Sequence, residues 1–448
     1  MKMNRYLLSS TLVAALGAFL FGFDTAVISG TTDALRHVFQ LSSGQLGFTV
    51  ASALIGTILG SIAAGYPAER YGRKKTLIAL AVFYIVSALG CGLAWTWMSL
   101  VIFRFIGGIA IGVASVVAPL YIAEIAPPHS RGRLVAVTQL NTVLGILMAY
   151  FTNYVIASLF SAQATEGATI AWRWMFGIVA APSVLFFLLA LSIPESPRWL
   201  VKRRRLQEAD EILRKLGNEN IESLLDEITK SLHQETVRTT EPFFQQKYRK
   251  PILLAIMVAT FNQMTGINAL IYYTADIFRM AGAERASALL QSVIIGATCL
   301  AFTLVAMAVI DRFGRKRLLV TGAAGMAFCL GTTAFAFYNG IGGGVILISL
   351  MAFIAFFAFS QGSVIWVFLS EIFPNRVRAK GQSLGTFTHW FWCAIVSWTF
   401  PIIAERSGGH AFSFFAGMMV LQLIMVLKFL PETKGVSLEQ IQRKLGIE

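Results

Sequence analysis

The stretches that decide the fold are two copies of one motif, Glu69-Arg70-Tyr71-Gly72-Arg73-Lys74 and Asp311-Arg312-Phe313-Gly314-Arg315-Lys316. Their central glycines, Gly72 and Gly314, lie 242 positions apart. Each copy stands in a short polar break between long apolar runs. A motif of this length that occurs twice in the same setting indicates an internal repeat.

A second, unrelated pattern repeats in the same order. Glu124 precedes Arg131 by seven residues, Glu371 precedes Arg378 by seven, and the two glutamates lie 247 positions apart. Because two motifs recur at nearly the same offset, we infer that the chain arose by duplication of a six-helix unit. This arrangement is typical of proteins that rock two halves around a central site.

The apolar runs between these motifs are long enough to cross a membrane. The chain of 448 residues is 56% hydrophobic and only 13% charged, whereas soluble domains have about 25% charged residues. A membrane crossing needs about 20 apolar residues in a helix. The pattern predicts twelve spans, near residues 6–28, 45–65, 76–95, 98–123, 134–157, 172–193, 250–275, 287–310, 318–338, 345–370, 381–404 and 409–430.

The distribution of basic residues predicts the orientation of these spans. The net charge is +14, and Lys and Arg gather in alternate loops, around residues 70–75, 131–133, 202–205, 312–317 and 376–380. The positive-inside rule places such loops in the cytoplasm, which puts both termini there as well. Topology therefore explains the charge, and we expect no nucleic-acid partner.

One long polar stretch, residues 197–245, separates the halves and has acids and bases at helical spacing. We predict an all-α membrane protein of four parts. They are an N-terminal six-helix bundle (residues 1–196), cytoplasmic linker helices (197–245), a C-terminal six-helix bundle (246–431) and a short cytoplasmic tail (432–448).

The cysteines offer no sign of a metal or redox site. Cys91, Cys299, Cys329 and Cys393 lie within apolar segments and lack the short paired spacing that such sites use. We interpret them as reduced packing residues and expect no metal and no cofactor.

Several further motifs resemble the sugar-porter branch of the major facilitator superfamily along essentially the whole chain. They are the stretch Gly22-Phe23-Asp24-Thr25-Ala26-Val27-Ile28-Ser29-Gly30, Pro119 with Tyr121 and Glu124, Pro194-Glu195-Ser196-Pro197-Arg198, Gly266-Ile267-Asn268 with Tyr272-Tyr273, and Pro431-Glu432-Thr433-Lys434-Gly435. The resemblance, strongest to bacterial proton-coupled pentose and hexose symporters, implies a major facilitator fold with two pseudo-symmetric six-helix bundles. It also implies a monosaccharide, a proton and the lipid bilayer as partners of a monomeric chain.

Asp24 is a carboxylate inside an apolar span, where a charge is costly and therefore marks a candidate functional site. In the family the matching Asp is the protonation site, and the matching Arg, here Arg104, tunes it. The resemblance thus implies proton coupling by Asp24 and Arg104. The alternative is a permanently paired structural salt bridge, although buried pairs stabilise poorly compared with apolar packing.

Sugar recognition needs amides and hydroxyls for the sugar's hydroxyl groups and aromatic faces for its C–H surfaces. The resemblance implies these candidate residues: Phe21, Gln139, Asn262, Gln263, Asn268, Tyr272, Trp366, His389 and Trp390. Spacing supports a shared face for the amides near residue 263 and the later pair Asn268 and Tyr272. Gly266 would let that helix break, as in many substrate-binding spans. Without the family, any one of these amides could simply hydrogen-bond a neighbouring helix.

The loop motifs place acids beside arginines at helix ends. The resemblance implies that they form a cytoplasmic latch which holds the outward-facing state. Its residues would be Glu69, Arg73, Glu124, Arg131, Asp311, Arg315, Glu371 and Arg378. If the motifs only set topology, the repeated acids would have no explanation, because acids contribute little to orientation.

The sequence departs from the family pattern at the expected sugar site. Asn262 replaces a usual glutamine, Cys299 a usual asparagine, and His389 a usual amide, while Ser363 replaces a proline. Ile146 stands where bacterial xylose symporters have a glutamine, as it does in glucose transporters. These changes predict a pocket rebuilt for a different sugar or stereochemistry. His389 is either a hydrogen-bonding substitute or a second titratable group that acts near neutral pH.

Our leading functional hypothesis is proton-coupled import of a monosaccharide by alternating access. The alternatives are a passive sugar facilitator or exporter and, third, a sugar sensor, although only residues 432–448 follow the last span. The sequence has no metal-ligand cluster, nucleophile-base pairing or phosphate-binding loop, so we do not expect an enzyme.

Overall fold

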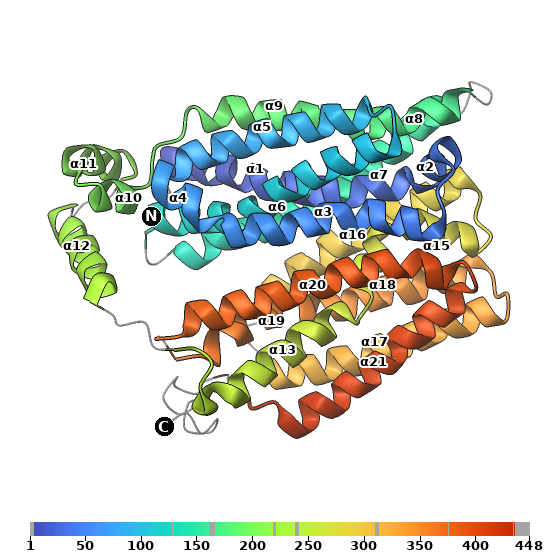
Figure 1. The fold of residues 1–448 in the computed structure, drawn as a ribbon. Coiled ribbons are helices and arrows are strands. Elements are labelled where there is room, and N and C mark those ends of the chain that lie inside the picture. The colour runs from blue at the N-terminus through green and yellow to red at the C-terminus, as the bar shows by residue number, and fades with distance from the viewer. Residues whose placement is uncertain are drawn as a thin grey trace. The chain divides into compact units, whose positions relative to one another are not determined.

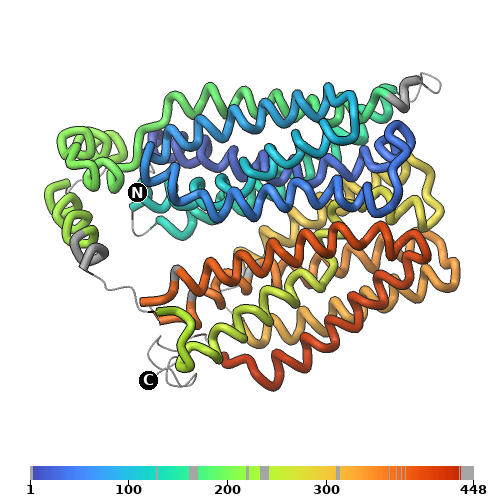
Figure 2. Tube along the Cα trace, in the orientation of Figure 1, coloured from blue at the N-terminus to red at the C-terminus, as the bar shows by residue number. Residues whose placement is uncertain are grey.

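The computed structural model describes residues 4–127, 130–160, 166–217, 221–237, 242–309, 313–374, 376–432 and 434. Within these ranges every regular element is a helix (Figure 1), and the chain can be followed through them in Figure 2.

Twelve helical spans among the described residues are long and apolar enough to cross a membrane. They are Arg5–Gly30, Ser43–Ala63, Arg73–Gly92, Trp97–Ile125, Arg131–Phe160, Ile170–Ala190, Gln246–Tyr272, Arg285–Ala308, Arg315–Tyr338, Gly343–Leu369, Lys380–Ala404 and Gly408–Phe429. The prediction of an all-α membrane protein with twelve spans is confirmed, and most bounds agree to within a few residues.

The chain divides into two compact units. Unit 1 comprises Met1–Val27, Ser52–Ala149 and Ile170–Thr239. Helices lying wholly or partly in it are α1 (Arg5–Val27), α3 (Ser43–Ala63), α4 (Gly65–Tyr71), α5 (Arg73–Gly92), α6 (Trp97–Ile125), α7 (Arg131–Phe160), α8 (Glu166–Gly177), α9 (Ala180–Ala190), α10 (Pro197–Lys202), α11 (Leu206–Lys215) and α12 (Ile221–Val237). Within the unit, α1 and α5 each pack against both α6 and α9.

Glycines let α3 and α6 approach each other closely. A Cβ added at Gly56 or Gly60 would lie 2.3 Å from a backbone oxygen of α6, and one at Gly108 or Gly112 would lie 1.9 or 2.2 Å from a backbone oxygen of α3. Small residues four positions apart on both partners are the usual way for membrane helices to pack, because apolar side chains gain little by leaving lipid.

The short helices α10 to α12 have a small apolar core of their own. Trp199, Leu200, Val201 and Ala209 are buried there, with α12 packing its apolar side chains against them. Their burial explains how this polar stretch forms ordered helices.

Unit 2 comprises Ile28–Ala51, Tyr150–Thr169 and Thr240–Glu448, and so takes in two segments from the first half of the chain. Its further elements are η1 (Ile28–Gly30), α2 (Thr32–Phe39), η2 (Gln246–Tyr248), α13 (Arg249–Gln263), α14 (Ile267–Tyr272), α15 (Thr274–Met280), α16 (Arg285–Val309), α17 (Arg315–Tyr338), α18 (Gly343–Phe359), α19 (Gln361–Glu371), α20 (Arg378–Ala404) and α21 (Gly408–Phe429). Helix α17 packs along α18 and α21, and α13 packs along α20 (Figure 1).

Two spans of unit 2 are broken. The predicted break at Gly266 is confirmed: its φ of +80° is left-handed, and an added Cβ would lie 2.4 Å from the Phe415 ring. The same span breaks again at Tyr273, between α14 and α15. The span of α18 and α19 breaks at Ser360, whose φ is −111° and ψ is −90°. Broken helices expose backbone groups, and in a membrane these must be satisfied within the protein.

Candidate functional site

A buried ion pair joins α1 and α6 in unit 1. Arg104 Nη1 lies 3.1 Å from Asp24 Oδ2, and the side chains are 1% and 8% exposed. The same nitrogen lies 3.4 Å from the carbonyl oxygen of Asp24. The structure thus brings together the two residues that the sequence predicted as the proton-coupling pair.

The guanidinium of Arg104 is only partly satisfied. Its Nε and Nη2 are buried and have no hydrogen-bond partner among the described residues, and its Cζ lies 5.7 Å from the centre of the Phe176 ring. A buried cation held by one carboxylate oxygen depends strongly on that carboxylate's charge. Protonation of Asp24 would therefore release Arg104 from its main partner.

Unit 1 also holds two of the predicted sugar-contacting residues. Phe21 is half-buried on α1, one turn before Asp24, and Gln139 is exposed on α7. Their side chains therefore remain accessible, as a substrate contact requires.

Amide side chains form a connected network in unit 2. Asn268 Nδ2 donates to Gln263 Oε1 at 2.6 Å, and Gln263 Nε2 donates to Asn262 Oδ1 at 3.0 Å. Gln263 Nε2 also lies 3.1 Å from a ring nitrogen of His389. The break at Gly266 makes this possible, because it brings the first turn of α14 back over the end of α13.

Aromatic rings flank this network. The centre of the His389 ring lies 5.1 Å from the ring centre of Trp366 and 5.1 Å from that of Trp390. Trp366 is 41% exposed although it is a large apolar side chain, whereas Trp390 and Tyr272 are buried. An exposed indole beside buried amides is the combination that a sugar surface requires.

One member of the network escaped sequence analysis. Asn262 Nδ2 lies 3.3 Å from the carbonyl oxygen of Gln361 and 3.5 Å from its Oε1, while Gln361 Nε2 is buried and has no partner among the described residues. Gln361 is an amide within a long apolar run, and that was the signal in the sequence that could have identified it.

The first copy of the charged loop motif forms a compact cluster of ion pairs. Arg73 donates to both carboxylate oxygens of Glu124 at 2.9 Å and to Glu69 at 3.0 Å. Arg73 and Glu124 are almost fully buried. The cluster therefore joins α4, α5 and the end of α6.

The second copy is less complete in the described residues. Arg315 Nη2 lies 3.2 Å from Glu371 Oε1, whereas Asp311 falls outside the described residues. Arg131 is exposed and has no ion pair among those residues, and Arg378 donates only to the carbonyl oxygen of Phe373 at 3.4 Å. Of the eight predicted latch residues, the structure therefore places five in ion pairs.

Two glutamates that the sequence analysis did not select occupy equivalent positions beside these arginines. Glu195 Oε1 accepts from the backbone nitrogens of Arg73 and Lys74 at 2.8 and 3.1 Å. Glu432 accepts from those of Arg315 and Lys316 at 2.9 and 3.2 Å. Each carboxylate satisfies the free N–H groups at a helix start. Burial raises the pKa of Glu195, although these bonds oppose the effect. The repeated Pro-Glu pairs at 194–195 and 431–432 were the available signal.

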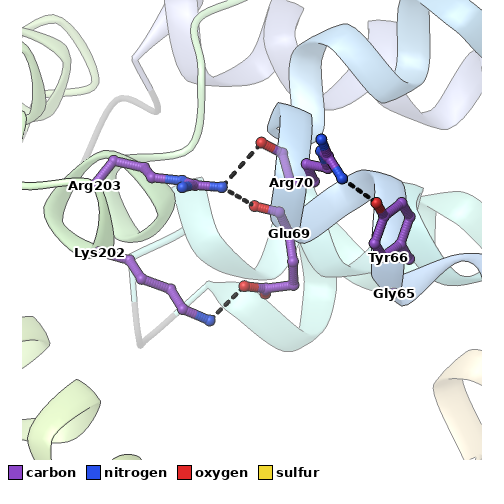
Figure 3. Close-up of a pocket in the computed structure, with 6 residues that line it drawn as sticks. All are labelled: Gly65, Tyr66, Glu69, Arg70, Lys202 and Arg203. Carbon is purple, nitrogen blue, oxygen red and sulfur yellow. Dashed lines mark hydrogen bonds and ion pairs between the residues drawn. The ribbon is translucent and has the colours of Figure 1, made fainter.

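An open pocket of about 600 Å³ lies where α10 meets α4 (Figure 3). Arg203 donates to the carbonyl oxygens of Glu69 and Arg70, and Lys202 pairs with the Glu69 carboxylate. Burial raises the pKa of Glu69, but the Lys202 hydrogen bond and the charges of Arg73 and Lys202 outweigh it and hold the pKa below its usual range. Lys202 and Arg203 are occupied in tying α10 to α4, and the Arg70 side chain donates to the Tyr66 hydroxyl within α4. No predicted sugar-contacting residue lines the pocket.

Comparison with known proteins places this arrangement in context. Residues 10–445 match the family described as Sugar (and other) transporter. The chain is 40% identical to the D-xylose-proton symporter of Escherichia coli, covering 98% of this chain and 96% of that protein. It is 36% identical to the arabinose-proton symporter of Bacillus subtilis, over 96% and 93% of the two chains. The solved inward-open conformation of the E. coli xylose transporter XylE superposes with a TM-score of 0.88 at 39% identity, covering 98% of this chain and all of that one.

Proposed function

This chain belongs to the sugar transporter family, and we propose that it imports a monosaccharide, a pentose or a hexose, together with a proton across the cytoplasmic membrane by alternating access. The observation that carries the proposal is the buried pair of Asp24 and Arg104 at 3.1 Å. A carboxylate in a membrane span needs a functional reason, because an apolar residue would be less costly there.

The partial satisfaction of Arg104 supports coupling over a fixed structural bridge. Two of its three guanidinium nitrogens have no partner among the described residues, so the pair is not built for maximum stability. A proton arriving at Asp24 would free Arg104 to move, and departure of the proton would draw it back. The proton is the coupling ion in this scheme.

The sugar site would be formed by the residues predicted from the sequence, of which unit 2 contributes the amide network and Trp366. The neutral hydrogen bonds among Asn262, Gln263 and Asn268 would exchange for bonds to sugar hydroxyls. His389 would act there as a hydrogen-bonding group between two indole rings. A pentose or hexose substrate agrees with the relatives, which are named as xylose and arabinose symporters. The replaced polar residues of the predicted site would adapt it to a different sugar of that size.

The distribution of charge supports an orientation of the chain in the membrane. The basic loops would face the cytoplasm with both termini, and the outer ends of the spans would include η1, α2 and α15. We propose the division into bundles at residues 1–196 and 246–431, with linker helices at 197–245 and a tail at 432–448. The chain would work as a monomer, with the ion-pair clusters around Arg73 and Arg315 acting as the cytoplasmic latch.

Uptake by purified protein in liposomes tests the proposal. A panel of labelled pentoses, hexoses and cyclitols is offered with an inward proton gradient, which is then collapsed. We expect one sugar to accumulate only while the gradient lasts. Asp24→Asn should abolish accumulation and preserve sugar exchange, because the amide cannot carry the proton.

Asp210→Asn provides a matched control, since Asp210 pairs with Arg214 on the surface of α11. It should accumulate sugar like the wild type. Equal, equilibrating uptake with and without the gradient would instead make the protein a passive facilitator. Uphill transport by Asp24→Asn would remove Asp24 from the coupling step.

A further inference from the structure

The helical backbone hydrogen bonds are interrupted between α14 and α15, and the bond from Ala275 N to Ile271 O is among those not made. Tyr273 has a φ of −121° and a ψ of 22°, outside the helical range. A continuous helix would join Ala275 N to the carbonyl oxygen of Ile271. In this structure each of these two groups bonds to a side chain from another segment.

Two hydroxyl groups replace the missing bond. Ala275 N donates to Ser29 Oγ at 3.2 Å, and the Tyr150 hydroxyl donates to Ile271 O at 2.8 Å. The Tyr150 hydroxyl also lies 2.9 Å from Thr274 Oγ1, which itself reaches Ile271 O at 3.2 Å. Ser29 lies in η1 and Tyr150 in α7, and both belong to unit 2 with α14 and α15.

These groups are shielded from water. Ser29 and Tyr150 are each 1% exposed, and Thr274 is fully buried. An unpaired backbone group in such surroundings is costly. The two hydroxyls therefore make the broken conformation possible.

On its other side α15 is tied to α20. The Tyr273 hydroxyl donates to the carbonyl oxygen of Ser397 at 2.8 Å, and the Tyr273 ring stacks on Phe400 at 5.2 Å. Only Ser29 and Tyr150 come from the first half of the chain. Their departure would leave Ala275 N without its acceptor and Ile271 O with only the local donor Thr274 Oγ1 among the groups named here, so the two backbone groups could then bond each other.

We propose that Ser29 and Tyr150 form a hydroxyl clamp that positions the sugar-binding helix α14 during transport. With the clamp closed, the span is bent at Tyr273, which sets the direction of Asn268 and Tyr272. When the outer ends of α1 and α7 withdraw, the span straightens and the Ala275–Ile271 bond forms in place of the two lost bonds. The same backbone pair thus has two satisfied arrangements, as a two-state element requires. The role in transport rests on the proposed function.

Hydrogen exchange measured without sugar tests the clamp directly. In Tyr150→Phe and Ser29→Ala, amides of residues 270–280 should exchange about fivefold faster than in the wild type, the effect expected for one buried hydrogen bond. Ser29→Thr retains a hydroxyl and should restore wild-type exchange. Tyr154→Phe, a half-buried tyrosine one turn further along α7, is the matched control and should leave exchange unchanged.

Transport kinetics provide the second measurement. A weakened clamp favours the state open to the outside, so the apparent KM for uptake and kcat should both fall by about three- to tenfold. Simple loss of folded protein would lower kcat and leave KM unchanged. Tyr150→Phe removes a single oxygen atom and carries the test even if Ser29→Ala fails to fold.

Wild-type exchange in both Tyr150→Phe and Ser29→Ala would overturn the clamp, as would a lower kcat with unchanged KM and unchanged exchange. If the wild type transports no sugar in any condition, the proposed function fails, and the exchange experiment still decides whether the clamp exists.

Discussion

Gln263 lies at the centre of the polar network in unit 2. It is fully buried, accepts from Asn268, and donates to Asn262 and towards His389. Its removal would leave three polar side chains without their shared partner, and an unsatisfied polar group costs about 1–3 kcal/mol where it is buried, as Asn262 is. Because the network and Trp366 lie side by side, the arrangement of Gln263 would decide how the proposed site meets a sugar.

We therefore predict that Gln263→Ala weakens sugar binding at least about tenfold, the effect of losing one to two net hydrogen bonds. Calorimetric titration with the sugar that drives uptake measures this affinity. Gln291→Ala, on α16, serves as the control because the Gln291 amide donates locally, to Ser287 Oγ one turn earlier. Wild-type affinity in Gln263→Ala would place the sugar elsewhere.

The residue scale also separates what sequence could predict from what it could not. The spacing of Gln263 and Asn268 on one broken span predicted that they would lie together, and they do. The contact of Gln263 with His389 joins residues 126 positions apart, and no periodicity encodes such a distance. Tyr150 was missed for the same reason, since its partner Ile271 is 121 positions away.

At the scale of elements, α2 and α15 meet through charged side chains in unit 2. Arg279 Nη1 lies 2.6 Å from Asp33 Oδ1. Asp276 Oδ2 is buried and has no hydrogen-bond partner among the described residues. Burial raises the pKa of Asp276 to about 6, although a Thr32 hydrogen bond and the Arg279 charge lower it; Asp33 raises it further and Arg36 lowers it.

A raised carboxyl pKa means that this packing is strongest when Asp276 is protonated. The stabilisation of the fold by protonated Asp276 is complete below the ordinary carboxyl pKa near 4. It is lost as the pH rises through about 6. Between pH 5 and pH 7 this lowers the folding equilibrium constant about tenfold, which is about 1.3 kcal/mol of the free energy of unfolding. The amide of Asp276→Asn cannot lose a proton. The variant should therefore have a higher Tm than the wild type at pH 7, and the difference in Tm should be much smaller at pH 5.

Scanning fluorimetry at both pH values measures this difference in Tm. Asp226→Asn is the control, because Asp226 pairs with Lys230 on an exposed face of α12. An equal shift in Tm at pH 5 and pH 7 for Asp276→Asn would contradict the burial of a titrating carboxyl.

The helix breaks show which features of the elements can be predicted from the local sequence and which cannot. The break at Gly266 could be predicted, because glycine adopts a positive φ without strain. The breaks at Tyr273 and Ser360 carry no glycine or proline at the bend. At Tyr273 the bend depends on hydroxyls supplied by η1 and α7, so only tertiary structure reveals it.

At the scale of the whole molecule, the internal repeat contains the same arrangement of a glutamate and a helix start in each half. A glutamate from a Pro-Glu pair accepts from the first backbone nitrogens of α5 in unit 1 and of α17 in unit 2. The arginine at each helix start then pairs with an acid at the end of the following long span. Duplication conserved the geometry, but the surroundings of the two arginines have diverged.

The divergence predicts unequal energetics. Arg73 is 5% exposed and makes three bonds to two carboxylates, whereas Arg315 is 16% exposed, makes one at 3.2 Å, and has its Nε without a partner among the described residues. Removal of Arg73 leaves the buried Glu124 carboxylate unpaired, which costs about 3–5 kcal/mol. The Arg315 pair is only partly buried, with side chains 16% and 22% exposed, so its removal should cost less.

Arg73→Ala should therefore lower the Tm several times more than Arg315→Ala, with the exposed Arg317→Ala as the control for lost positive charge at a helix start. Combining Arg73→Ala with Glu124→Gln should recover part of the loss, since the unpaired charge disappears. Equal falls in Tm for the two variants would contradict this prediction. They would mean that the Arg73 and Arg315 clusters contribute equally to stability, and that Arg315 has further partners outside the described residues.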